Sequence, residues 1–187
     1  MENNSLLQSS RHWYLLLILG IILIIVGIWV FSTPVVSYAT LSLLFAFSFF
    51  VTGILEIIYA VSNRKEMNNW GWSLVGGIID LVIGILLISL PLTSMLFLAF
   101  YVGFGILFRS VMAIGQAINL KTQKAGDWGY LLLIGILGLL FSFILIWNPL
   151  FAGFTIVFYT GMAFLIVGIF EIYFSFRLRK IRSRYTG

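Results

Sequence analysis

One pattern occurs three times along the chain and constrains the fold more than any other feature of the sequence. Each copy has a tryptophan that is followed, at steps of seven residues, by a small residue, a second small residue and a proline. The copies begin 57 and then 58 residues apart, which indicates one supersecondary unit used three times. They read Trp13-Gly20-Gly27-Pro34, Trp70-Gly77-Gly84-Pro91 and Trp128-Gly135-Ser142-Pro149.

The composition places these repeats in a membrane. Of the 187 residues, 61% are hydrophobic and only 9% are charged, whereas soluble domains are about 25% charged. Residues 13–55 and 128–170 each form 43 consecutive positions without Lys, Arg, Asp or Glu, and a membrane span needs about 20 apolar residues. We therefore predict an all-α integral membrane protein with six transmembrane helices. The predicted spans lie near 13–32, 36–61, 70–90, 93–118, 128–147 and 151–176.

The prolines separate the two helices of each repeat. Pro34, Pro91 and Pro149 each end a helix, because proline lacks a backbone donor and clashes with the preceding turn. Each repeat is predicted to be a tight helical hairpin, and the three parallel hairpins are predicted to have a pseudo-threefold arrangement. The predicted organisation is an N-terminal segment at 1–12, a membrane domain at 13–176 with repeats 13–61, 70–118 and 128–176, and a basic tail at 177–187.

The basic residues predict the orientation. Ten of the eleven Lys and Arg residues fall on one side of the predicted membrane, and the proline turns on the other side carry none. Because basic residues concentrate on the cytoplasmic side, both termini are predicted to be cytoplasmic. The ten residues are Arg11, Arg64, Lys65, Lys121, Lys124, Arg177, Arg179, Lys180, Arg182 and Arg184.

The small residues of the first span in each repeat share one helix face, because a step of seven residues is nearly two turns. A face without side chains lets another helix approach closely. This face is an internal packing seam in one interpretation and the lining of a central path in the other. The predicted seam consists of Gly20, Gly27, Gly77, Gly84, Gly135 and Ser142.

Four ionisable residues, Glu56, Asp80, Arg109 and Glu171, lie inside the predicted spans. A charge at the bilayer centre costs about 2.5–3.5 kcal/mol, so it normally has a partner or faces water. Asp80 and Arg109 lie at matching depths of roughly 14–15 Å on helices joined by a tight turn, and they are predicted to form an ion pair. Glu56 and Glu171 each follow the proline of their repeat by 22 residues, about one helical turn from the height of Arg109.

Three acids against one arginine leave an excess of negative charge. Burial disfavours that excess, so at least one carboxyl group is expected to hold a proton near neutral pH. In one interpretation the cluster only locks the repeats together through charge-assisted hydrogen bonds. In the other, an intramembrane carboxyl group accepts or passes protons.

The remaining residues exclude several kinds of chemistry. The chain has no cysteine and a single histidine, His12, so no thiol nucleophile or metal site is expected. No catalytic or nucleotide-binding motif is present, and we predict that the protein is not an enzyme and uses no cofactor. A nucleic-acid partner is not expected either. The basic tail is predicted to contact anionic lipid at the cytoplasmic face, through Arg177, Arg179, Lys180, Arg182 and Arg184.

The repeat ends resemble a known family. Gly53-Ile-Leu-Glu56-Ile, Gly168-Ile-Phe-Glu171-Ile and Phe108-Arg109-Ser110-Val-Met-Ala-Ile-Gly-Gln-Ala117 are similar to the bacterial HdeD-type acid-resistance membrane proteins, which are built from short repeats of a domain of unknown function. The resemblance covers the chain from Trp13 to Phe176. It implies a bacterial inner-membrane protein with six spans and a link to acid stress, and it supplies no catalytic residues.

We therefore expect a non-enzymatic, stress-related inner-membrane protein whose Asp/Arg/Glu cluster senses or accepts protons. Two other functions stay open. The first is a small transporter or channel, in which the parallel repeats surround a polar route. The second is a scaffold or assembly partner, for which a homo-oligomer or another membrane protein would be the partner.

Overall fold

The computed structural model describes residues 13–66, 68–123 and 126–185. Predictions for residues 1–12, which include Arg11 and His12, and for Lys124 lie outside these ranges. So do those for the side chains of Arg179, Arg182 and Arg184, of which only the backbone is described.

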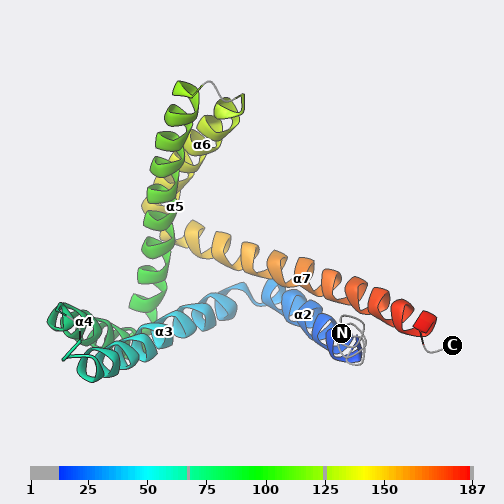
Figure 1. The fold of residues 1–187 in the computed structure, drawn as a ribbon, viewed down its shortest axis with the longest axis horizontal. Coiled ribbons are helices and arrows are strands. Elements are labelled where there is room, and N and C mark those ends of the chain that lie inside the picture. The colour runs from blue at the N-terminus through cyan, green and yellow to red at the C-terminus, as the bar shows by residue number, and fades with distance from the viewer. Residues whose placement is uncertain (1–12, 67, 124–125, 186–187) are drawn as a thin grey trace. The chain divides into compact units, whose positions relative to one another are not determined.

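Six long helices make up the described chain (Figure 1). Each contains an apolar stretch that is long enough to cross a membrane, as predicted. The last helix is longer than expected, because it continues without a break through most of the predicted basic tail. The helices are α2 (Trp13–Ser32), α3 (Pro34–Ser62), α4 (Trp70–Ser89), α5 (Pro91–Thr122), α6 (Trp128–Trp147) and α7 (Pro149–Tyr185).

Each repeat breaks at its proline, as predicted. Pro34, Pro91 and Pro149 are the first residues of α3, α5 and α7, where the missing backbone donor costs nothing because that N–H would have no partner within the helix. The preceding helix closes the same way each time, with a backbone N–H that donates to the carbonyl four residues earlier at 3.0–3.1 Å. In the third repeat the Asn148 side chain also caps α7, because its Oδ1 accepts the N–H of Phe151 at 3.1 Å.

The close helix pairs join one repeat to another. The second helix of a repeat packs against the first helix of the next: α3 lies along α4, and α5 lies along α6 (Figure 1). The last helix, α7, packs in the same way against the first, α2. The structure does not show the predicted hairpin of the middle repeat, since α5 contacts α6 far more extensively than it contacts α4.

The three pairs share one contact between small residues. In the pair α3·α4, a Cβ atom added to Gly77 would lie 3.1 Å from the carbonyl oxygen of Gly53. In the pair α5·α6, a Cβ atom added to Gly135 would lie 3.2 Å from the carbonyl oxygen of Ser110. These residues occupy equivalent positions in the repeats, and a side chain at Gly77 or Gly135 would crowd the facing helix.

All six predicted seam residues are buried, and the pairs also contact at a second level nearer the proline turns. There, a Cβ atom added to Gly27 would lie 3.2 Å from the carbonyl oxygen of Gly161, and one added to Gly84 would overlap the backbone of Phe50. Each pair therefore has contacts along two turns or more of both helices.

A second packing centre lies where the second helices begin, within the compact part formed by residues 35–154. Tyr38, Met95 and Gly153 each lie four residues after the proline of their repeat. The Tyr38 hydroxyl donates a hydrogen bond to the carbonyl of Met95, and the Tyr38 ring covers Gly153. In addition, Ser94 Oγ donates to the buried carbonyl of Ser42 at 2.9 Å. We call these five residues the second-helix junction.

Candidate intramembrane charge site

Glu56 lies in the contact between α3 and α4. Its side chain is half-buried and rests on Gly76 of α4, where an added Cβ atom would lie 3.3 Å from Oε1 and 3.7 Å from Oε2. The missing side chain at Gly76 thus makes room for the carboxyl group. Among the described residues, Glu56 has no hydrogen-bond or ion-pair partner.

Asp80 lies on the same helix pair. It follows Gly76 by four residues, which places it one turn further along the same face of α4, and its side chain is half-buried. Leu81, the next residue, packs against Gly53, the glycine one turn before Glu56. The structure therefore brings two acids, Glu56 and Asp80, to one pair of apolar helices.

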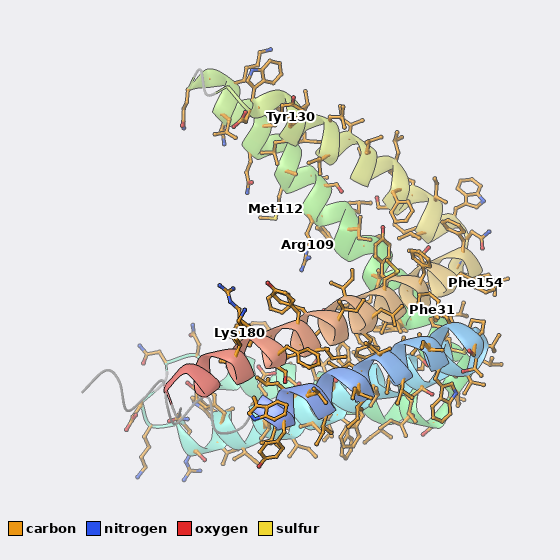
Figure 2. The ribbon with its side chains drawn as sticks, turned by 90° about the vertical axis from the view of Figure 1, so that its right-hand side faces the viewer. Phe31, Arg109, Met112, Tyr130, Phe154 and Lys180 are labelled. Atoms are coloured by element: carbon orange, nitrogen blue, oxygen red, sulfur yellow. The ribbon has the colours of Figure 1, made fainter. Side chains whose placement is uncertain are left out.

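Arg109 lies apart from this pair of acids. It is exposed on α5, which packs on α6, whereas Asp80 belongs to α4, which packs on α3. Within the described ranges no ion pair joins Asp80 to Arg109, and Figure 2 shows the guanidinium projecting away from α6. Matching depth did not bring the two residues together, because α4 and α5, the helices that flank Pro91, pack far less on each other than α5 packs on α6.

Glu171 is half-buried on α7, in the compact part that contains α2. It is the counterpart of Glu56 in the third repeat, but its surroundings differ. The position in α2 that corresponds to Gly76 is occupied by Leu19. The glycine niche that receives Glu56 is therefore specific to the contact between the first and second repeats.

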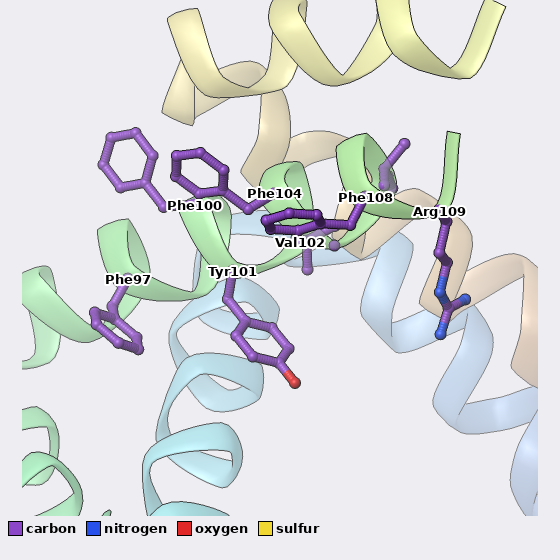
Figure 3. Close-up of a pocket in the computed structure, with 9 residues that line it drawn as sticks. Phe97, Phe100, Tyr101, Val102, Phe104, Phe108 and Arg109 are labelled. Atoms are coloured by element: carbon purple, nitrogen blue, oxygen red, sulfur yellow. The ribbon is translucent and has the colours of Figure 1, made fainter. Parts of the chain in front are cut away.

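Arg109 borders a groove of about 670 Å³ on the surface of α5. Figure 3 shows aromatic side chains along this helix, with Arg109 at one end. This groove was not predicted from the sequence. The signal was present in the repeats, since the counterparts of Arg109 are the uncharged residues Thr52 and Val167. The groove is lined chiefly by Phe97, Phe100, Tyr101, Phe104, Phe108 and Arg109.

The structure also bears on possible metal ligands and on the basic residues at the helix ends. In the described part of the chain, no cluster of His, Cys, Asp or Glu has the size needed to hold a metal ion. In the basic tail, Arg177 and Lys180 are exposed on the continuous helix α7. Near the opposite end of the helix pair α5·α6 from the proline turns, Lys121 lies 4.9 Å from the ring centre of Trp128.

Comparison with known proteins places the chain in a family. A family model described as "Short repeat of unknown function (DUF308)" matches residues 18–89, 75–147 and 133–186. The matches begin 57 and 58 residues apart, as do the copies of the tryptophan–proline pattern. The first match contains both helices of the pair α3·α4, and the second contains both helices of the pair α5·α6. No curated protein and no solved structure matches the chain. The chain therefore belongs to the DUF308 family, and it carries the short repeat of unknown function three times.

Proposed function

We propose that this protein is a proton-responsive, non-enzymatic protein of the bacterial inner membrane, related to the HdeD-type acid-resistance proteins and active in acid stress. The observation that carries the proposal is the placement of Glu56. Its carboxyl group rests on Gly76, one turn from Asp80, with no basic partner among the described residues. Two acids on one apolar helix pair form a site whose charge depends on the proton concentration.

A charged side chain is costly inside the membrane. An ionised carboxylate near the bilayer centre costs about 2.5–3.5 kcal/mol, and a second one nearby adds repulsion. Binding a proton removes both costs. A rise in external acid would therefore neutralise the site and change the preferred packing of α3 against α4.

The proposal also includes the orientation of the chain in the membrane. The basic loops and the tail favour a topology in which both termini are cytoplasmic and the proline turns face outward. The exposed Arg177 and Lys180 would then contact anionic lipid of the cytoplasmic leaflet, at about 1 kcal/mol per charge.

Proton uptake by the purified protein in liposomes tests the proposal. An external acid jump is applied to wild type, Glu56→Gln and Asp80→Asn, with Glu66→Gln as the matched control. Glu66 is exposed in the loop after α3, so its replacement should leave the uptake unchanged. We expect folded Glu56→Gln and Asp80→Asn to lose the uptake that wild type and Glu66→Gln show.

Two results would contradict the proposal. Equal, background-level signals in all four proteins would mean that the acids serve only in packing. Continued flux with turnover, in place of a limited uptake, would favour the small transporter or channel instead. In cells, acid survival at matched expression should fall for Glu56→Gln and stay normal for Glu66→Gln.

A further inference from the structure

The groove on α5 has the length of a lipid chain. From Phe97 to Arg109 the helix advances about 18 Å, at about 1.5 Å per residue. One leaflet of the hydrocarbon layer is about 15 Å thick, half of the roughly 30 Å total. The walls are almost wholly aromatic and aliphatic, so the groove offers an acyl chain a continuous apolar contact.

Arg109 gives this groove a charged end. It is exposed, and the described residues supply no anion for it. A cation inside a span is costly unless it meets an anion or reaches water. A guanidinium binds a phosphate group through two parallel hydrogen bonds, which makes arginine well suited to this partner.

The charged end of the groove also lies towards the predicted cytoplasmic side of the membrane, where it can meet lipid phosphates. Beyond Arg109, α5 carries the polar residues Gln116 and Asn119 and ends near Lys121, so this part of the helix approaches the side with the basic loops. A long arginine side chain extends towards the headgroups from such a position. In the structure α5 begins at Pro91, and Arg109 follows 18 residues, or about 27 Å, later. A hydrocarbon layer of about 30 Å that starts at the proline turn therefore ends close to Arg109, nearer to the phosphates of the cytoplasmic leaflet than the depth predicted from the sequence.

We propose that the α5 groove binds one anionic phospholipid, whose phosphate contacts Arg109 and whose acyl chain lies along the aromatic side chains towards Phe97. The middle repeat alone provides this site. At the positions of Arg109 and Phe97, the first repeat has Thr52 and Thr40, which supply neither the cation nor the aromatic wall. The proposal uses no residue of the proton site, so either one can fail without the other.

Glycines on α5 allow a sharp test. Gly105 lines the groove, and a Cβ atom added there meets no atom within 4 Å. Gly105→Leu therefore places an apolar side chain in the groove, and its Cβ atom displaces no neighbour. Gly115 is equally open but does not line the groove, which makes Gly115→Leu the matched control.

The experiment is native mass spectrometry of the full-length protein in detergent, with equimolar phosphatidylglycerol and phosphatidylcholine added. Wild type and Gly115→Leu should retain one phosphatidylglycerol per chain in preference to phosphatidylcholine. Arg109→Gln should lose about tenfold or more of this preference, since it removes charge-assisted hydrogen bonds. Gly105→Leu should bind neither lipid at this site. A double variant of the tail, Arg177→Gln with Lys180→Gln, should keep the bound lipid.

Several outcomes would overturn the proposal. Undiminished binding by Gly105→Leu would show that the lipid lies elsewhere, and this variant decides the matter if Arg109→Gln does not fold. Loss of the lipid in the tail variant would assign it to the tail. A wild-type dimer without lipid, which Arg109→Gln converts to monomers, would assign Arg109 to a contact between copies of the chain.

Discussion

Gly20 and Gly168 lie back to back, although 147 residues of chain separate them. A Cβ atom added to either glycine would fall 2.8 Å from the carbonyl oxygen of the other. This is the contact between α2 and α7, and it repeats the contact that Gly77 makes with Gly53. The first and last helices are therefore partners through the same small-residue packing that joins consecutive repeats.

An engineered disulfide should be able to join α2 and α7. A Cβ atom added to Gly168 would lie 2.8 Å from Cγ1 of Ile24, which suits a disulfide between Ile24→Cys and Gly168→Cys, since bonded cysteines have Cβ atoms about 3.5–4.5 Å apart. The chain has no native cysteine to compete. After cleavage at a protease site inserted in the loop that follows α3, the two fragments should stay together on a non-reducing gel and separate on a reducing one. Cross-links that form only between two chains would contradict the pairing.

A side chain at Gly77 should separate α3 from α4. An added Cβ atom would lie 2.9 Å from the backbone nitrogen of Ile57, and backbone atoms of a packed helix have little freedom to move aside. We expect Gly77→Val to lower the free energy of unfolding by roughly 1–3 kcal/mol. Thermal unfolding followed by circular dichroism in detergent measures the effect. Gly71→Val on the same helix meets no neighbour within 4 Å and serves as the control; equal destabilisation of both variants would refute the contact.

Removal of one hydroxyl should weaken the second-helix junction slightly. Ser94→Ala loses the buried hydrogen bond to Ser42, and such bonds between membrane helices contribute about 0.6 kcal/mol on average. Alanine fits here, since Ala152 occupies the same position in the third repeat. The control is Ser89→Ala, whose hydroxyl bonds only to Ile85 of its own helix. A melting temperature that falls no further for Ser94→Ala than for Ser89→Ala would argue against the junction.

The two kinds of connection should face opposite sides of the membrane. Asn68 lies exposed between α3 and α4, and Leu90 lies exposed at a proline turn. In a chain without native cysteine, Leu90→Cys should react with a membrane-impermeant maleimide on intact cells. Asn68→Cys should react only after the cells are permeabilised. The reverse pattern would invert the proposed orientation, and labelling of both on intact cells would rule out a single orientation.

The helices and their breaks were predictable, because long apolar runs and prolines act locally. The choice of helix partners was not. A short connection normally joins antiparallel neighbours, which favoured hairpins at Pro34, Pro91 and Pro149. In the middle repeat the structure instead packs α5 along α6, the helix to which a longer loop connects it, because both of these helices carry small residues in register. The recurrence of Gly53, Ser110 and Gly168 at equivalent positions in the second helices was the signal for this pairing.

The charge site was only partly predictable, for a similar reason. The sequence identified Glu56, Asp80 and Arg109 as unusual, because ionisable residues stand out in apolar helices. The depths of Asp80 and Arg109 predicted an ion pair, but depth gives only one coordinate and does not say which helix faces meet. The glycine pair Gly76-Gly77 held the missing information, since the other repeats have a large residue before the seam glycine and only the second repeat leaves space for Glu56.

The packing of α7 on α2 has a consequence for the number of repeats in the chain. Each contact joins the face of a second helix to the face of a first helix. A linear array of such contacts has one unpaired face of each kind, one at either end, and it either grows into a filament or closes into a ring. Here the two end faces occupy each other, so the chain leaves neither face of this kind free to recruit another copy. A chain cut down to one repeat would keep both faces and lack both partners. To form the same helix pairs, such a fragment would have to assemble with copies of itself, whereas the full chain forms these pairs within one polypeptide.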